Sequence, residues 1–82
     1  FADEDYQSEI LLQLRRRCEL QVSLDTRTPH FSAFMACVDR GSWQECPQSF
    51  PWSQHPGLNL LEVRSRNNAG VEGIISTATL EM

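Results

Sequence analysis

A strict alternation of apolar and polar residues, repeated in short runs, is the feature that most limits how this chain can fold. In the run from Leu58 to Arg66, one side of an extended strand would carry apolar or small residues and the other charged ones. The first set is Leu61, Val63 and Ser65, and the second is Glu62, Arg64 and Arg66. A period of two residues is typical of a strand with one buried face. The turn-forming residues Asn67 to Gly70 follow, which predicts a hairpin.

Four other stretches also fit strands. Residues 18–24 alternate cleanly, residues 31–39 are apolar on both faces as in the middle of a sheet, and residues 74–82 alternate again. Residues 9–17 fit a short amphipathic helix or a strand, and we favour the strand because so short a helix is marginal in water. Together these runs predict an all-β fold, a small antiparallel β-sandwich of about six to seven strands.

The length of 82 residues predicts a single domain. Residues 1–8 are polar and acidic and are expected to be a linker or flexible terminus, which leaves residues 9–82 as the sandwich. A domain this small buries only about 60% of the surface that its unfolded chain exposes. Such a domain often depends on a covalent staple, a metal or a neighbour.

The cysteines are the candidates for such a covalent cross-link. The turn at Arg40-Gly41-Ser42 predicts a short returning strand that brings Cys46 beside Cys37. A disulfide between them would stabilise the fold by about 2.5–3 kcal/mol in the chain-entropy model. Cys18 would remain as an unpaired thiol. The alternative is a redox-active or metal-binding protein of a reducing compartment, in which Cys37 and Cys46 stay free.

The segment Pro47 to Pro56 contains three prolines, which exclude a central strand. We expect a loop across the end of the sandwich, with Phe50 or Trp52 filling the core. The alternative is an exposed aromatic platform for a sugar or a peptide.

Several classes of function are disfavoured by composition. The net charge is −4 and the seven basic residues are dispersed arginines, so nucleic-acid binding is not expected. No apolar run is long enough to span a membrane. The spacing of Cys37, Cys46 and the two histidines fits no standard zinc site, so we predict neither metal nor cofactor. No catalytic constellation is recognisable, which predicts a protein that is not an enzyme.

The motifs between Ala33 and Gly70 are similar to those of a known group of modules. Their order is Cys37 and Asp39, then Gly41, Trp43 and Cys46, then a proline-bearing loop, Leu-Glu-Val-Arg at 61–64 and Asn-x-x-Gly at 67–70. This order resembles immunoglobulin-like and fibronectin type III-like modules of large extracellular and cell-surface proteins. In those modules the two cysteines form a disulfide. This chain differs in the spacing of Cys37 and Asp39, one residue closer, and has Asn59 where histidine is common.

The resemblance implies a non-catalytic structural or protein-binding module, one of several domains in an extracellular or cell-surface protein. Its partners would be neighbouring domains or another surface protein, with a glycan as a further candidate. The residues we single out for binding are Trp43, Trp52, Arg64 and Arg66. The alternative is an accessory domain of a larger secreted or lumenal enzyme, which holds glycan through Trp43 or Trp52 or orients the catalytic domain.

Overall fold

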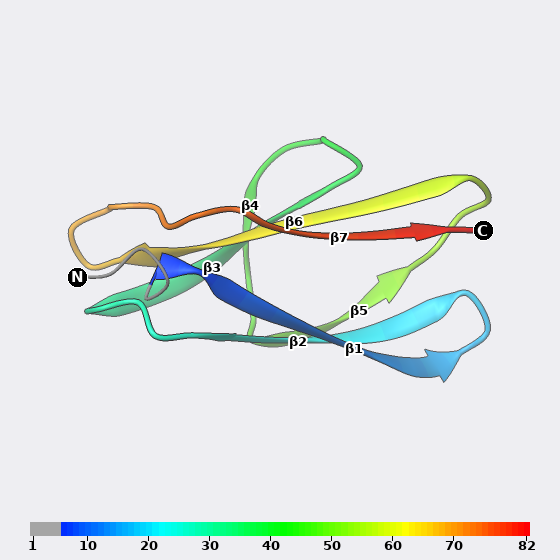
Figure 1. Ribbon diagram of the computed structural model, residues 1–82, viewed down its shortest axis with the longest axis horizontal. Coiled ribbons are helices and arrows are strands. Elements are labelled where there is room, and N and C mark those ends of the chain that lie inside the picture. The colour runs from blue at the N-terminus through cyan, green and yellow to red at the C-terminus, as the bar shows by residue number, and fades with distance from the viewer. Residues whose placement is uncertain (1–5) are drawn as a thin grey trace.

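The computed structural model describes residues 6–82 and contains seven β-strands in this range (Figure 1). The strands are β1 (Ser8–Arg16), β2 (Glu19–Thr26), β3 (Phe31–Val38), β4 (Gln44–Cys46), β5 (Ser49–Ser53), β6 (Leu58–Asn67) and β7 (Ser76–Glu81). The ambiguous segment 9–17 is therefore a strand. Among the described residues, no helix is long and apolar enough to cross a membrane.

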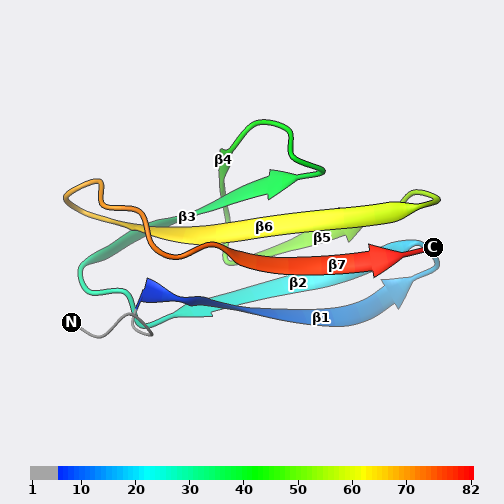
Figure 2. The same cartoon turned by 45° about the horizontal axis from the view of Figure 1, so that its top comes forward.

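The strands form two antiparallel sheets that lie face to face (Figure 2). One has the order β1-β2-β5 and the other the order β4-β3-β6-β7. The prediction of an all-β antiparallel sandwich is confirmed. The arrangement is compatible with immunoglobulin-like and fibronectin type III-like domains.

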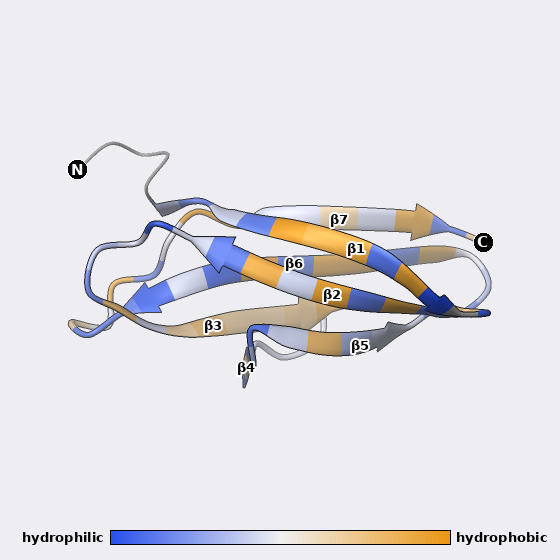
Figure 3. Cartoon of the chain, turned by 90° about the horizontal axis from the view of Figure 1, so that it is seen from below, coloured by the Kyte–Doolittle hydropathy of each residue, from blue (hydrophilic) through white to orange (hydrophobic). Residues whose placement is uncertain are grey.

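The core lies between the two sheets, where the alternating strands place their apolar residues. Bands of apolar and polar residues follow one another along β2 and β6 (Figure 3). The buried cluster consists of Val22, Leu24, Phe34, Trp52, Leu61 and Val63. The alternation predicted for residues 61–66 is confirmed, because Leu61, Val63 and Ser65 are fully buried.

The strand predicted over residues 18–24 begins one residue later than expected. β2 begins only at Glu19, and Cys18 is exposed in the turn that follows β1. Its φ of 59° places it in the left-handed region, which a tight connection between two strands requires.

The prediction of a loop over residues 47–56 is also wrong in part, because β5 lies within it. Pro51 pairs with Gln21 at the edge of the three-stranded sheet, where a missing N–H is tolerated. The expected core residue is confirmed, since Trp52 is buried, and Phe50 packs against the same cluster. The prolines of this segment therefore exclude a central strand but permit an edge strand such as β5.

The start of β1 and the segment before it are hydrogen-bonded to the start of β7 and to the loop between β6 and β7. Ile74 N–H donates to Tyr6 O at 3.0 Å, and Ser76 Oγ donates to Ser8 O at 2.5 Å. Ser8, at the end of the predicted linker, is buried and begins β1. Residues 1–5 of that linker lie outside the described residues.

Candidate functional site

Three of the four predicted binding residues meet on the outer side of the four-stranded sheet. Arg64 and Arg66 alternate along β6 with core-facing residues, so both point away from the core. Trp43 immediately precedes β4 on the other side of β3. We call this surface the arginine face and define it by Trp43, Glu45, Arg64, Arg66 and Glu72.

Arg64 is the fixed centre of the arginine face. Its guanidinium carbon lies 4.2 Å from the centre of the Trp43 ring, within the range of a cation–π contact. Its Nη2 forms an ion pair with Glu72 in the loop between β6 and β7. The side chain of Arg64 is only 24% exposed. Arg64 therefore connects the β3–β4 loop to the β6–β7 loop across the sheet.

Arg66 is held more loosely. Its Nη2 lies 3.5 Å from Glu45 Oε2, and the side chain of Glu45 is 67% exposed. An ion pair this long and this exposed contributes little to stability. Arg66 is therefore the arginine of this face that can leave Glu45 and pair with a carboxylate of a partner protein.

Trp52 lies apart from the arginine face. It is 3% exposed and belongs to the core cluster, where it pairs across from Leu20 of β2. Trp43 and Trp52 lie close together in the sequence. The structure separates them, because Trp43 contacts Arg64 on the outer side of the four-stranded sheet and Trp52 lies in the core.

The expected disulfide between Cys37 and Cys46 is not formed. All three cysteines of the chain, which all lie among the described residues, are free thiols. The register of β3 with β4 sets Cys46 opposite Phe34 on the core side of the sheet. Cys37 is three residues beyond Phe34 and so lies on the outer side, where its Sγ donates to Gly41 O at 3.3 Å. The two thiols therefore occupy opposite faces of one sheet.

A pair of polar side chains that the sequence analysis missed joins two loops at the other end of the sheet. Asp39 Oδ1 accepts the Leu60 N–H at 3.0 Å, and Asp39 Oδ2 lies 2.8 Å from His55 Nε2. His55 Nδ1 lies 2.9 Å from Pro56 O. Asp39 has a left-handed φ of 52°, which turns the chain sharply after β3. The only sequence signal was Asp39 itself, because its partner is far along the chain.

These contacts favour the charged forms of both groups. The Leu60 N–H, followed by the hydrogen bond from His55, lowers the pKa of Asp39 below its ordinary value of 3.8. The Pro56 carbonyl, followed by Asp39, raises the pKa of His55 above its ordinary value of 6.5. A protonated imidazole can donate both N–H groups at once, to the carbonyl and to the carboxylate.

We expect the Asp39–His55 pair to add a pH-dependent contribution to stability. The raised pKa of His55 gives stability that is complete below 6.5 and lost as pH rises through the folded-state value. The lowered pKa of Asp39 gives stability that is present above 3.8 and lost on acidification. The contribution is therefore largest between these values. Replacing His55 by Gln should flatten the change in urea midpoint from about pH 5.5 to pH 8.

The matched control is His30→Asn, because asparagine tolerates the left-handed φ of 54° at this position. It should keep the pH dependence of the parent protein. Equal pH profiles for the parent and for His55→Gln would contradict the assignment. Both groups are exposed, so the effect should also weaken as salt is added.

Among residues 6–82, no group of three or more histidine, cysteine, aspartate or glutamate side chains is placed to hold a metal ion. The fold and its surfaces define the class of protein, a small two-sheet antiparallel domain with a charged and aromatic outer face. Comparison with family models, curated proteins and solved structures finds no match to this chain.

Proposed function

We propose that this chain is a non-catalytic, fibronectin type III-like or immunoglobulin-like module with a structural and protein-binding role. The strand order supports the fibronectin type III-like class. In constant-type immunoglobulin domains the fourth strand pairs in the sheet of the first two strands. Here β4 pairs with β3 in the other sheet. The motif resemblance between Ala33 and Gly70 supports the same class of module.

The observation that carries the binding role is the arginine face. Tryptophan and arginine are enriched at protein interfaces and among the residues that dominate binding energy. Arg64 is already ordered by Trp43 and Glu72, so little side-chain entropy is lost when a partner contacts it. Arg66 offers a guanidinium fork to a partner carboxylate. The face therefore fits an acidic patch on another protein.

The structural role is supported by the direction of the chain. The start of β1 and the end of β7 lie at opposite ends of the long axis, which measures 39 Å (Figure 1). Domains attached at these two positions would follow one another in a row. We propose an extracellular or cell-surface protein as the context, and this part rests on the motif resemblance alone, since Cys37 and Cys46 form no bridge.

A glycan-holding accessory domain is the less favoured candidate. Sugar-binding tryptophans need an open ring face, and the Trp43 ring is covered by the guanidinium of Arg64. Trp52 is in the core. A sugar that stacks on this face of Trp43 would have to displace an ion-paired arginine.

The test is a binding screen against purified extracellular domains and a glycan array, with the module displayed as a multimer. We expect a protein partner whose binding falls about tenfold or more in Arg66→Ala and in Trp43→Ala. Arg27→Ala, an exposed arginine between β2 and β3, is the control and should bind as the parent does. Binding only to glycans would support the accessory-domain alternative. A protein partner that binds Arg66→Ala and Trp43→Ala as tightly as it binds the parent would overturn the proposed role of the arginine face.

A further inference from the structure

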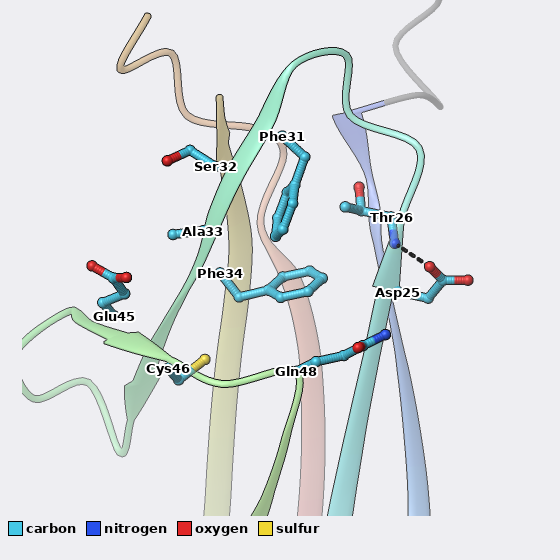
Figure 4. A pocket seen from close by; sticks show the side chains of 9 residues that line it. All are labelled: Asp25, Thr26, Phe31, Ser32, Ala33, Phe34, Glu45, Cys46 and Gln48. Atoms are coloured by element: carbon cyan, nitrogen blue, oxygen red, sulfur yellow. Dashed lines mark hydrogen bonds between the residues drawn. The ribbon is translucent and has the colours of Figure 1, made fainter. Parts of the chain in front are cut away.

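The sandwich has two long sides where the edges of its sheets meet, and the chain crosses only one of them. On that side the β4–β5 connection passes through Cys46 and Gln48 from one sheet to the other, beside the rings of Phe31 and Phe34 (Figure 4). The centres of these two rings are 4.8 Å apart. On the other side β1 and β7 are the edge strands, and no connection within residues 6–82 crosses between them (Figure 2). The free edge of β1 therefore lies on the open side of the sandwich.

β1 lacks the features that usually keep an edge strand from pairing with another chain. β5 contains Pro51, and β4 has only three residues. β1 has nine residues, and its middle from Ile10 to Leu14 is a mainly apolar run without charge, proline or glycine (Figure 3). Within it, Leu11 is 57% exposed and Leu14 is 81% exposed. A long apolar edge of this kind is a template for a further strand.

The backbone of β1 directs every second residue toward the free edge. Leu24 N–H donates to Gln48 O at 2.8 Å, on the side of β2 away from β1. Its cross-strand partner Ile10 therefore belongs to a pair without mutual hydrogen bonds. Because such pairs alternate along an antiparallel ladder, the N–H and C=O groups of Ile10, Leu12 and Leu14 face the free edge.

The outer side of β1 carries an acidic pair without a cation. Glu9 stands directly opposite Asp25 of β2, and neither has an ion pair among the described side chains. Like charges at opposite positions disfavour strand pairing. Farther along β1, Arg15 contacts Glu19 through Nε and Gln21 through Nη1, which leaves its Nη2 without a contact within residues 6–82. A strand that placed an arginine beside Glu9 would neutralise the acidic pair.

We propose that β1 pairs with β1 of a second copy of this chain and joins the two three-stranded sheets into one. The antiparallel register that sets Leu12 opposite Leu12 of the second copy fits the whole edge. It pairs the edge-facing backbone groups of Ile10 with those of Leu14 of the second copy, and it covers the exposed Leu14 side chain. On the outer side it sets Glu9 opposite Arg15 of the second copy. The strand is thus self-complementary, as a twofold interface requires.

The test is the oligomeric state of the whole chain, measured by analytical ultracentrifugation from about 10 µM to about 1 mM, because a small interface gives a reversible dimer. Glu9→Arg and Arg15→Glu should each weaken the dimer by about tenfold or more, since each sets like charges opposite one another at two symmetric positions. An equimolar mixture of the two variants should dimerise as the parent does, because each new charge then meets its opposite. A failure to fold would not restore dimerisation in the mixture.

The matched control is Arg17→Glu, which makes the same change of charge in the turn after β1 and should alter the dissociation constant by less than about twofold at moderate salt. Amide hydrogen exchange gives a second readout. The amides of Leu12 and Leu14 should gain protection as the dimer forms, whereas those of Leu11 and Gln13, which face β2, should be protected at every concentration.

Three outcomes would overturn the proposal. The first is a monomer at every concentration. The second is a dimer that gains amide protection along β7 instead of β1. The third is a mixture of Glu9→Arg and Arg15→Glu that dimerises no better than either variant alone, or a dimer that Arg17→Glu weakens as much as Arg15→Glu does. None of these outcomes depends on the partner of the arginine face.

Discussion

Replacing Trp52 by alanine is expected to remove most of the stability of this protein. Truncation of a buried tryptophan costs about 3–5 kcal/mol, because transfer free energy is lost and a cavity remains. Trp52 is 3% exposed and packs in the core cluster together with Leu24, Leu61 and Val63. At about 0.05–0.15 kcal/mol per residue, the total stability of a domain this size is not much larger than that cost. Urea unfolding followed by far-ultraviolet circular dichroism measures the change.

The matched control for Trp52→Ala is Trp43→Ala. Trp43 is half-buried on the arginine face, and its specific contact is the cation–π stack with Arg64. Its loss should cost about 1 kcal/mol. If the two variants unfold at the same urea concentration, the assignment of one tryptophan to the core and the other to the surface is wrong.

The second large effect is expected at Asn59, whose side chain is fully buried between the β5–β6 loop and β7. Its Oδ1 accepts the His55 N–H at 2.8 Å. Its Nδ2 donates to His55 O at 2.8 Å and lies within 3.3 Å of the carbonyls of Gly57 and Leu80. One amide thus satisfies several backbone groups that have been removed from water.

Asn59→Ala should destabilise the protein by about 2–4 kcal/mol, because each buried polar group left without a partner costs about 1–3 kcal/mol. Asn68→Ala, at an exposed position in the β6–β7 turn, should change stability by less than about 0.5 kcal/mol. Both are measured by urea unfolding. The Asn59 variant should also lose the pH dependence assigned to Asp39 and His55, because Asn59 holds the His55 backbone in place. A stable variant with an unchanged pH profile would contradict this role.

Much of the fold was predictable because a strand with one buried face must alternate. That rule placed Leu61, Val63 and Ser65 inside and Arg64 and Arg66 outside, and the structure confirms both sets. The same rule could not foresee the irregularity in β3, which depends on pairing with β6 and not on the pattern of β3. The contact between the Phe31 and Phe34 rings was therefore not predictable from the sequence.

The arginine face was predicted as single residues and not as a site. Arg64 and Arg66 were found from the pattern of their strand, and Trp43 from the motif that it shares with known modules. Glu72, the ion-pair partner of Arg64, lies in a loop with no pattern of its own. Its place beside Arg64 depends on the path of the β6–β7 connection, in which Arg66 and Glu72 form an isolated antiparallel bridge.

The sequence by itself determined the all-β class, the approximate number of strands and the core-facing residues of β6, because these follow from local periodicity and turn chemistry. Only the tertiary structure decided which strands share a sheet, that Pro51 lies at an edge, and that Cys37 and Cys46 point to opposite sides. The physical reason is register. A shift of one residue in pairing moves every side chain of a strand to the other face, and register is fixed by contacts between distant parts of the chain.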